Sequence, residues 1–218
     1  MSDLQPTRDS WHRVAEHVLA AGQFATAGTI RLRAHPGGFA TVVGVDGRQL
    51  AVDGDRLILE DGRSTRFTTI GELARFAGVR PGLSGSYPPA TPLDPDLPLP
   101  VDLAAAERLA EWFALGDTAL RRFAEGLGRT QEPVLWSEHF DLGITIDAVN
   151  YGCSPGDDAI PEPYLYVGPH EGPLAADAFW NAPFGAVLSS EQVSGTADAA
   201  AFFASGRTLV EGARPATR

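Results

Sequence analysis

Residues 133–169, PVLWSEHFDLGITIDAVNYGCSPGDDAIPEPYLYVGP, combine the densest mixture of acidic, histidine and aromatic side chains with the only cysteine of the chain. Side chains of a β-strand alternate between two faces. In residues 134–147 one of these faces is apolar and is interrupted only by Glu138. Loss of hydration disfavours a charged carboxylate that has no partner. The alternation therefore predicts a strand whose core-facing side carries one acid.

A second strand is predicted over residues 162–167, where Tyr164 and Tyr166 share one face. Between the two strands, residues 151–158 read YGCSPGDD. A Pro-Gly pair followed by acids is typical of a turn or an exposed loop. We therefore expect a turn here, with Cys153 accessible to solvent.

The two predicted strands define a candidate ligand-binding patch. His139 and Asp141 are two residues apart, so they share the strand face opposite Glu138 and lie within reach of each other. The candidate residues are Trp136, Glu138, His139, Asp141, Tyr151, Glu162, Tyr164, Tyr166 and His170. Small-molecule pockets are mostly apolar with a few convergent polar groups, which is the composition of this set.

Charge and cysteine content exclude several classes of partner. The net charge is -11, and all 17 basic residues are arginines scattered along the chain. Nucleic-acid binding needs a basic footprint, so we expect no nucleic-acid partner. A single cysteine excludes an intrachain disulfide and a metal site made of thiolates. The sequence gives no oligomeric state.

The start of the chain, MSDLQPTRDS, has no apolar region behind a basic one, so we expect no signal peptide. No apolar run approaches the roughly 18 residues of a membrane-spanning helix. The sequence therefore predicts a cytoplasmic protein without a membrane partner.

Hydrophobic periodicity predicts an α+β fold, with antiparallel sheets flanked by helices. Apolar residues at helical spacing predict helices over residues 9–21, 69–78, 102–126 and 196–209, and Thr69 is expected to cap the second of them. Gly22 is expected to end the first helix, with His12 and His17 on its solvated flanks. Short alternating segments separated by Asp-Gly pairs predict a meander of strands over residues 29–67.

The order of these elements suggests an internal duplication within a single compact domain, residues 1–218. Residues 9–79 and 102–211 each contain a helix, several strands and a further helix. We expect two pseudo-repeated halves related by an approximate twofold axis. Residues 80–100, RPGLSGSYPPATPLDPDLPLP, are expected to be an extended connector, since proline excludes helix and central strand. The alternative is a peptide ligand for a domain that recognises proline.

The motifs LWSEHFDLGITI, YGCSPGD and PEPYLYVGP resemble a group of uncharacterised proteins from high-GC bacteria. They more distantly resemble a bacterial family of unknown function that has a Trp-x-x-Phe-Asp-Leu strand. The residues that carry this resemblance are Trp136, Phe140, Asp141, Leu142, Pro161, Glu162, Pro163, Tyr164 and Tyr166. The resemblance implies the order of elements and the region of interest, and it leaves both the reaction and any cofactor unknown. That family has glycine or serine near the position of His139, so His139 is not carried over.

Three functions are compatible with these residues. The first is binding of a small, partly apolar molecule in a pocket of the second half. The second is a hydrolase-type enzyme that uses a metal or carboxylate–histidine chemistry, although no recognised metal-ligand or catalytic motif is present. The third is a protein-interaction module. The sequence does not decide whether a reaction is catalysed, and we predict binding of a small molecule.

Overall fold

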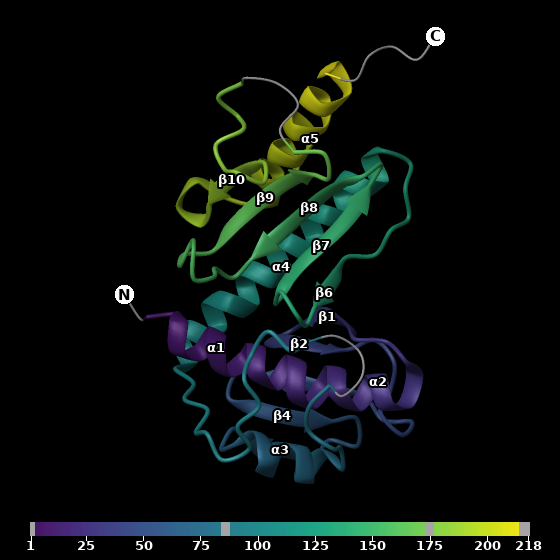
Figure 1. Cartoon of the computed structure of the whole chain (residues 1–218), viewed down its shortest axis with the longest axis vertical. Helices are drawn as coiled ribbons and strands as arrows, with labels where there is room; N and C mark the ends of the chain where they lie inside the picture. The colour runs from purple at the N-terminus through teal and green to yellow at the C-terminus, as the bar shows by residue number, and fades with distance from the viewer. Residues whose placement is uncertain (1–2, 84–87, 173–176, 214–218) are drawn as a thin grey trace. The chain divides into compact units, whose positions relative to one another are not determined.

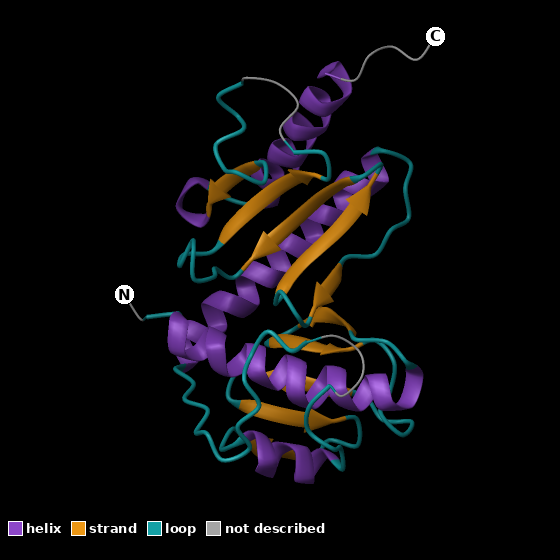
Figure 2. Cartoon of the chain, viewed as in Figure 1, coloured by secondary structure: helices purple, strands orange, loops and turns teal. Residues whose placement is uncertain are grey.

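The computed structural model describes residues 3–83, 88–172 and 177–213. They form helices and antiparallel strands, which confirms the predicted α+β class (Figure 2). The chain divides into two compact units, here called unit 1 (residues 1–114 and 134–141) and unit 2 (residues 115–133 and 142–218). The connector and the first part of the long helix thus belong to unit 1. The pseudo-repeated halves stay a prediction.

The first helix of unit 1 is longer than predicted. It has three consecutive segments, α1 (Gln5–Val14), the π-helix η1 (Ala15–Ala20) and α2 (Ala21–Ala27). It ends where Gly28 adopts a left-handed φ of 67°. The prediction that Gly22 ends the helix is wrong. Gly22 instead allows close packing, because a Cβ atom there would lie 2.6 Å from Cγ1 of Val79.

The predicted exposure of His17 is also wrong. All six residues of η1 are buried, and the His17 side chain is 0% exposed. A π-helical hydrogen bond spans five residues instead of four, so side chains leave the α-helical stripe on which the prediction rests. His12 is half-buried, and its ring stacks on Phe140 with centroids 5.2 Å apart.

Six antiparallel strands form the sheet of unit 1, in the order β6-β1-β2-β3-β4-β5. Their bounds are β1 (Arg31–His35), β2 (Gly38–Thr41), β3 (Leu50–Asp53), β4 (Arg56–Leu59), β5 (Ser64–Arg66) and β6 (Val134–Trp136). Strands β1 to β5 confirm the predicted meander. Asp46 and Gly47 both have positive φ, 49° and 79°, between the paired residues Val45 and Arg48. These angles are those of the tight turn that an Asp-Gly pair favours.

The first helix packs across this sheet (Figure 1). The Trp11 ring meets Phe39 edge to face at 5.6 Å, and its Nε1 donates to the carbonyl oxygen of Gly54 at 3.0 Å. Helix α3 (Ile70–Ala77) follows β5. Its cap is Thr69, whose hydroxyl accepts from the backbone N–H of Glu72, as the sequence predicts.

The described part of the Pro-rich connector has no helix or strand. It is attached to other elements of unit 1 by backbone hydrogen bonds. Gly71 donates to the Pro95 carbonyl oxygen and Leu99 donates to that of Thr68, both at 2.9 Å. The Ser10 hydroxyl donates to the Pro100 carbonyl oxygen at 2.8 Å. The described part of the connector is thus held to unit 1 by hydrogen bonds.

The single strand predicted over residues 134–147 is wrong. Strand β6 ends at Trp136, a turn follows, and β7 (Asp141–Ile146) begins after it. The Phe140 N–H donates to the Trp136 carbonyl oxygen at 2.7 Å, and Phe140 has a φ of 51°. Its ring packs edge to face on Phe39 and Phe113, at 5.4 and 5.6 Å. Burial of this ring thus accompanies the break in the strand alternation.

Unit 2 contains an antiparallel sheet in the order β10-β9-β8-β7. Besides β7, its strands are β8 (Val149–Ser154), β9 (Tyr164–Pro169) and β10 (Ala186–Ser189). The prediction of a turn from residue 151 is wrong, because β8 pairs with β7 up to Cys153 and with β9 up to Ser154. Cys153 is therefore buried rather than exposed.

Two helices cover the Tyr151 face of this sheet. They are α5 (Thr196–Ala213) and the part of α4 (Leu103–Gly126) that follows residue 114. The Tyr151 ring lies 4.6 Å from that of Phe123 on α4 and 6.1 Å from that of Phe203 on α5. These rings form the core of unit 2.

Gly116 is the closest approach of α4 to β8. A Cβ atom there would lie 2.6 Å from both Cβ and Sγ of Cys153. We expect Gly116→Ala to lower the free energy of unfolding by about 1–2 kcal/mol, since overpacking outweighs the gain in helix propensity. Gly126→Ala is the control, because nothing lies within 4 Å of its Cβ position. Urea unfolding of both variants measures the difference, and equal stabilities would contradict the packing argument.

Candidate functional site

Four of the candidate residues lie in unit 1, around the turn between β6 and β7. The Trp136 ring lies 5.5 Å from the guanidinium carbon of Arg31, a cation–π contact. Glu138 is half-buried, and its Oε2 is buried without a hydrogen bond to any described residue. His139 is exposed and Asp141 is half-buried. The break at Phe140 removes the regular alternation that was predicted to place Glu138 and His139 on opposite faces of one strand.

The other five candidates lie in unit 2, and the sheet separates them. Tyr151 is on the helix-covered face, whereas Tyr166 pairs with Gly152 and so lies on the opposite face with Tyr164. The rings of Tyr164 and Tyr166 are 6.3 Å apart. The Tyr164 hydroxyl donates to Asp157 at 2.6 Å.

The two remaining candidates, Glu162 and His170, are exposed. The Nε2 of His170 donates to the side-chain oxygen of Asn150 at 3.1 Å. The structure therefore brings the tyrosines of β9 together and separates both from Tyr151.

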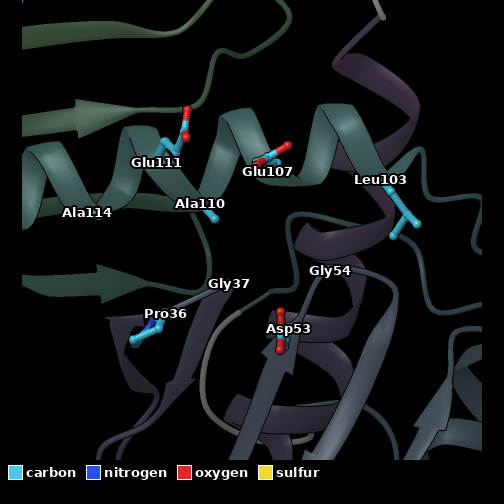
Figure 3. A pocket seen from close by; sticks show the side chains of 9 residues that line it. All are labelled: Pro36, Gly37, Asp53, Gly54, Leu103, Glu107, Ala110, Glu111 and Ala114. Carbon is cyan, nitrogen blue, oxygen red and sulfur yellow. The ribbon is translucent and has the colours of Figure 1, made fainter.

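A groove of about 510 Å³ lies in unit 1 (Figure 3). One wall consists of two hairpin turns, Pro36-Gly37 between β1 and β2 and Asp53-Gly54 at the end of β3. The other wall is the first part of α4. Its lining residues are Pro36, Gly37, Asp53, Gly54, Leu103, Glu107, Ala110, Glu111 and Ala114. Figure 3 shows Leu103 and Ala110 projecting from α4 toward the wall that carries Asp53.

The groove contains three carboxylates, and none has a charged partner within the described ranges. Glu107 and Glu111 are one helical turn apart on α4, a spacing at which like charges destabilise a helix. In Figure 3 the Glu111 carboxylate points away from Asp53. The carboxylates are therefore distributed around the groove and do not converge. Accordingly, no group of three or more His, Cys, Asp or Glu in the described part of the chain could hold a metal ion.

Glycine at position 37 shapes this wall. Its φ is 80°, and a Cβ atom there would collide with Oδ1 of Asp53. Because Gly37 has no side chain, the Asp53 carboxylate lies directly over the turn of the neighbouring hairpin.

A second polar group of unit 1 is the Glu16 carboxylate in η1, which is 0% exposed. Its Oε1 accepts from the N–H of Ala90, and its Oε2 accepts from the N–H of Thr91, both at 2.8 Å. The Thr91 hydroxyl also donates to Oε2, at 2.6 Å. A buried carboxylate is tolerated when its oxygens are hydrogen bonded. Glu16 thus fixes the connector to the helix.

His17 binds the same connector residue. Its Nε2 lies 3.0 Å from the carbonyl oxygen of Thr91 and 2.9 Å from its hydroxyl. A carbonyl oxygen only accepts, so Nε2 carries the proton and donates. Nδ1 is buried and makes no hydrogen bond to a described residue. Burial lowers the pKa of His17 below its ordinary 6.5, opposed by the nearby Glu16 carboxylate.

Neither the groove residues nor the Glu16–His17 pair is among the candidate site residues predicted from the sequence. The groove joins residues more than 50 positions apart, and only the fold makes them neighbours. For Glu16 a signal exists in the sequence, because Glu16 and His17 are two consecutive polar residues within a stretch that is otherwise apolar. The π-helical segment that buries both residues has no pattern in the sequence.

Comparison of the chain with protein-family models, curated proteins and solved structures found no match. The resemblance to high-GC bacterial proteins therefore stays a prediction. Across residues 3–83, 88–172 and 177–213, no helix has the length and apolar character needed to cross a membrane.

Replacing Glu16 tests its role in fixing the connector. Glutamine offers one acceptor oxygen instead of two and sets an amide N–H₂ against a backbone donor. We expect Glu16→Gln to lower the free energy of unfolding by about 1–3 kcal/mol, the cost of leaving a buried donor unsatisfied. Glu125→Gln, on the exposed surface of α4, is the matched control. Hydrogen exchange of residues 88–100 should also accelerate in Glu16→Gln, and unchanged exchange would contradict the role.

The lowered pKa of His17 predicts a dependence of stability on pH. Its pKa in the folded protein lies below the 6.5 expected of the unfolded chain. The resulting stability is fully present above pH 6.5 and is lost as the pH falls toward the folded value. Burial is also the main cause of the lowered pKa of His12.

We therefore expect the free energy of unfolding in urea to fall between about pH 7.5 and about pH 5.5. The single variant His17→Gln, which retains a donor toward Thr91, should reduce this dependence on pH. The single variant His12→Gln should reduce it as well. His35→Gln is the control, because its side chain is not buried. Identical pH profiles in all four proteins would show that neither histidine is the cause.

Proposed function

We propose that this protein binds a small, partly apolar organic cation in the groove of unit 1. The observation that supports this most directly is the groove itself, with a volume of about 510 Å³. Ligand sites are concave and occupy roughly 300–1,000 Å³.

The lining of the groove supports a ligand with two kinds of surface. Pro36, Leu103, Ala110 and Ala114 provide apolar contacts. Such contacts contribute roughly 25 cal/mol for each Å² of apolar surface removed from water. The ligand should therefore have an aliphatic or aromatic body.

The charge of the lining favours a cation. Asp53, Glu107 and Glu111 form no ion pair with any residue that the structure describes, although the chain carries 17 arginines. A bound ammonium or guanidinium group would relieve the repulsion between Glu107 and Glu111. Because the carboxylates are spread along the walls, they complement a ligand whose positive charges are separated by an apolar spacer.

Native mass spectrometry of the freshly purified protein is the first experiment, because it detects a co-purified ligand and the oligomeric state together. Three probes of one chain length then test the chemistry by calorimetry: hexane-1,6-diamine, hexan-1-amine and hexanoate. We expect the diamine to bind most tightly, the monoamine more weakly and the carboxylate not at all. Added salt should weaken binding of the diamine, since salt screens the interaction between exposed charges.

Removing the carboxylates of Glu107 and Glu111 on α4 should selectively weaken binding of the diamine. Each exposed charge pair is worth about 0.2–1 kcal/mol, so the double variant Glu107→Gln/Glu111→Gln should bind the diamine about 2- to 30-fold more weakly. Glu125→Gln lies on the same helix outside the groove and should bind as the wild type does. Hexanoate binding as tightly as the diamine, or equal affinity in all three proteins, would overturn the proposal.

A further inference from the structure

The sheet of unit 1 has two faces, and the first helix packs on one of them (Figure 1). Buried and accessible residues alternate along β3 and β4, and Val52 and Leu57 are fully buried on the helix side with Phe39. The residues between them point to the other side, where solvent reaches them. This other side is here called the open face, and it includes Arg31, Arg33, Ala51, Arg56, Ile58 and Arg66.

The fold gathers on the open face four arginines that are scattered in the sequence. Arg31 and Arg33 lie on β1, whereas Arg56 and Arg66 are a directly opposed pair on β4 and β5. Asp53 is the one acid among the described strand residues on this face. The whole chain has 28 acidic and 17 basic residues, so the open face is opposite in charge to the chain as a whole.

The two arginines of β1 are held by neutral groups. The guanidinium carbon of Arg31 lies 5.5 Å from the centre of the Trp136 ring. The Nε of Arg33 donates to the carbonyl oxygen of Thr41 at 3.3 Å. Neither arginine forms an ion pair with a residue that the structure describes. These contacts therefore orient the two guanidinium groups and leave their positive charge without a counterion.

The arginines at the other side of the open face are also available to an acid. Arg56 donates from Nε and Nη2 to the Ser64 hydroxyl, at 3.1 and 2.6 Å. The Arg66 side chain is 73% exposed, and its Nε lies 3.6 Å from a carboxylate oxygen of Asp55. An exposed ion pair of this length contributes little, so Arg66 can exchange it for a better-placed acid.

Apolar residues occupy the middle of the open face. Ala40, Ala51 and Ile58 are paired in one row across β2, β3 and β4. Ala51 and Ile58 are partly accessible, and Ala40 is 1% exposed opposite Arg33. The two short alanine side chains allow a partner to approach the sheet closely. The open face therefore has an apolar centre between two pairs of arginines.

We propose that the open face docks an acidic amphipathic helix of a partner protein. Neighbouring strands are about 4.8 Å apart, so about 14 Å separates β1 from β4. An α-helix with its side chains is about 10–12 Å across. A helix on the apolar centre thus brings acids on one flank to the arginines of β1, and acids on the other flank to those of β4 and β5. Its apolar side chains cover Ala51 and Ile58.

Charge and chemistry favour this occupant over two others. Single-stranded nucleic acid binds by stacking its bases on aromatic rings. The Trp136 ring already contacts Arg31, and the centre of the open face is aliphatic. A second copy of the open face would place arginines against arginines. An acidic helix, in contrast, complements both the charge and the apolar row.

Three fluorescent peptides of about 14 residues test the proposal by anisotropy. All three are designed as amphipathic helices. The first has leucine on one side and glutamate on both flanks, the second has lysine in place of glutamate, and the third has glutamine in place of leucine. We expect the glutamate–leucine peptide to bind most tightly, the peptide without leucine more weakly and the lysine peptide not at all. Added salt should weaken binding of the first peptide.

Removing one arginine from each side of the open face should weaken this binding. The variant Arg31→Gln/Arg56→Gln should bind the glutamate–leucine peptide about 2- to 30-fold more weakly, since it loses two exposed charge pairs. The control Arg75→Gln/Arg80→Gln loses the same charge at exposed positions outside the sheet and should bind as the wild type does.

A measurement on the wild-type protein serves if the variant does not fold. Backbone amide resonances of β2, β3 and β4 should shift when the glutamate–leucine peptide is added, and no shift at saturation would overturn the proposal. Equal affinity in the wild type and in a folded Arg31→Gln/Arg56→Gln, or tighter binding of an oligodeoxythymidine of the same length, would also overturn it. Self-association without peptide that the double variant abolishes would identify a second copy as the occupant instead. The Glu107→Gln/Glu111→Gln variant should bind the peptide normally, which separates this surface from the groove.

Discussion

The buried Glu16 carboxylate is the interaction on which the architecture of unit 1 depends. A charged group in an apolar interior is costly unless hydrogen bonds replace its hydration, and Glu16 receives three of them, all from Ala90 and Thr91. The connector in turn contains many prolines, which lack the N–H needed for regular structure. The connector thus supplies the donors that replace the hydration of Glu16, and Glu16 supplies the acceptors that fix the connector. The π-helical segment makes this possible, because it buries two consecutive polar residues in one helix.

The groove and a smaller pocket of unit 1 occur where irregular backbone meets a regular element. The groove lies between two hairpin turns and α4, and the smaller pocket lies between the connector and η1. Regular strands and helices satisfy their own polar groups and fill the space between them, whereas turns leave concave surface and unpaired side chains.

Local signals in the sequence predicted most elements correctly. Thr69 caps α3, the Asp46-Gly47 turn joins its hairpin, and the meander of unit 1 has the expected strands. In each case the responsible contact joins neighbouring residues, so the pattern is readable without the fold. The failures have another cause. Phe140 interrupts a well-alternating strand where its ring packs among Phe39, Phe113 and His12, residues that are far away in the sequence.

The sequence by itself therefore determined the α+β class, the placement of most helices and strands, and the acidic, lysine-free character of the surface. These follow from periodicity, capping and composition, which are properties of short segments or of the chain as a whole. Only the tertiary structure decided that Tyr151 and Tyr166 lie on opposite faces of a sheet, that Cys153 and His17 are buried, and that Asp53 faces a helix that begins 50 residues later. The physical reason is that side-chain neighbours depend on strand pairing and packing between distant segments, and no local pattern specifies either.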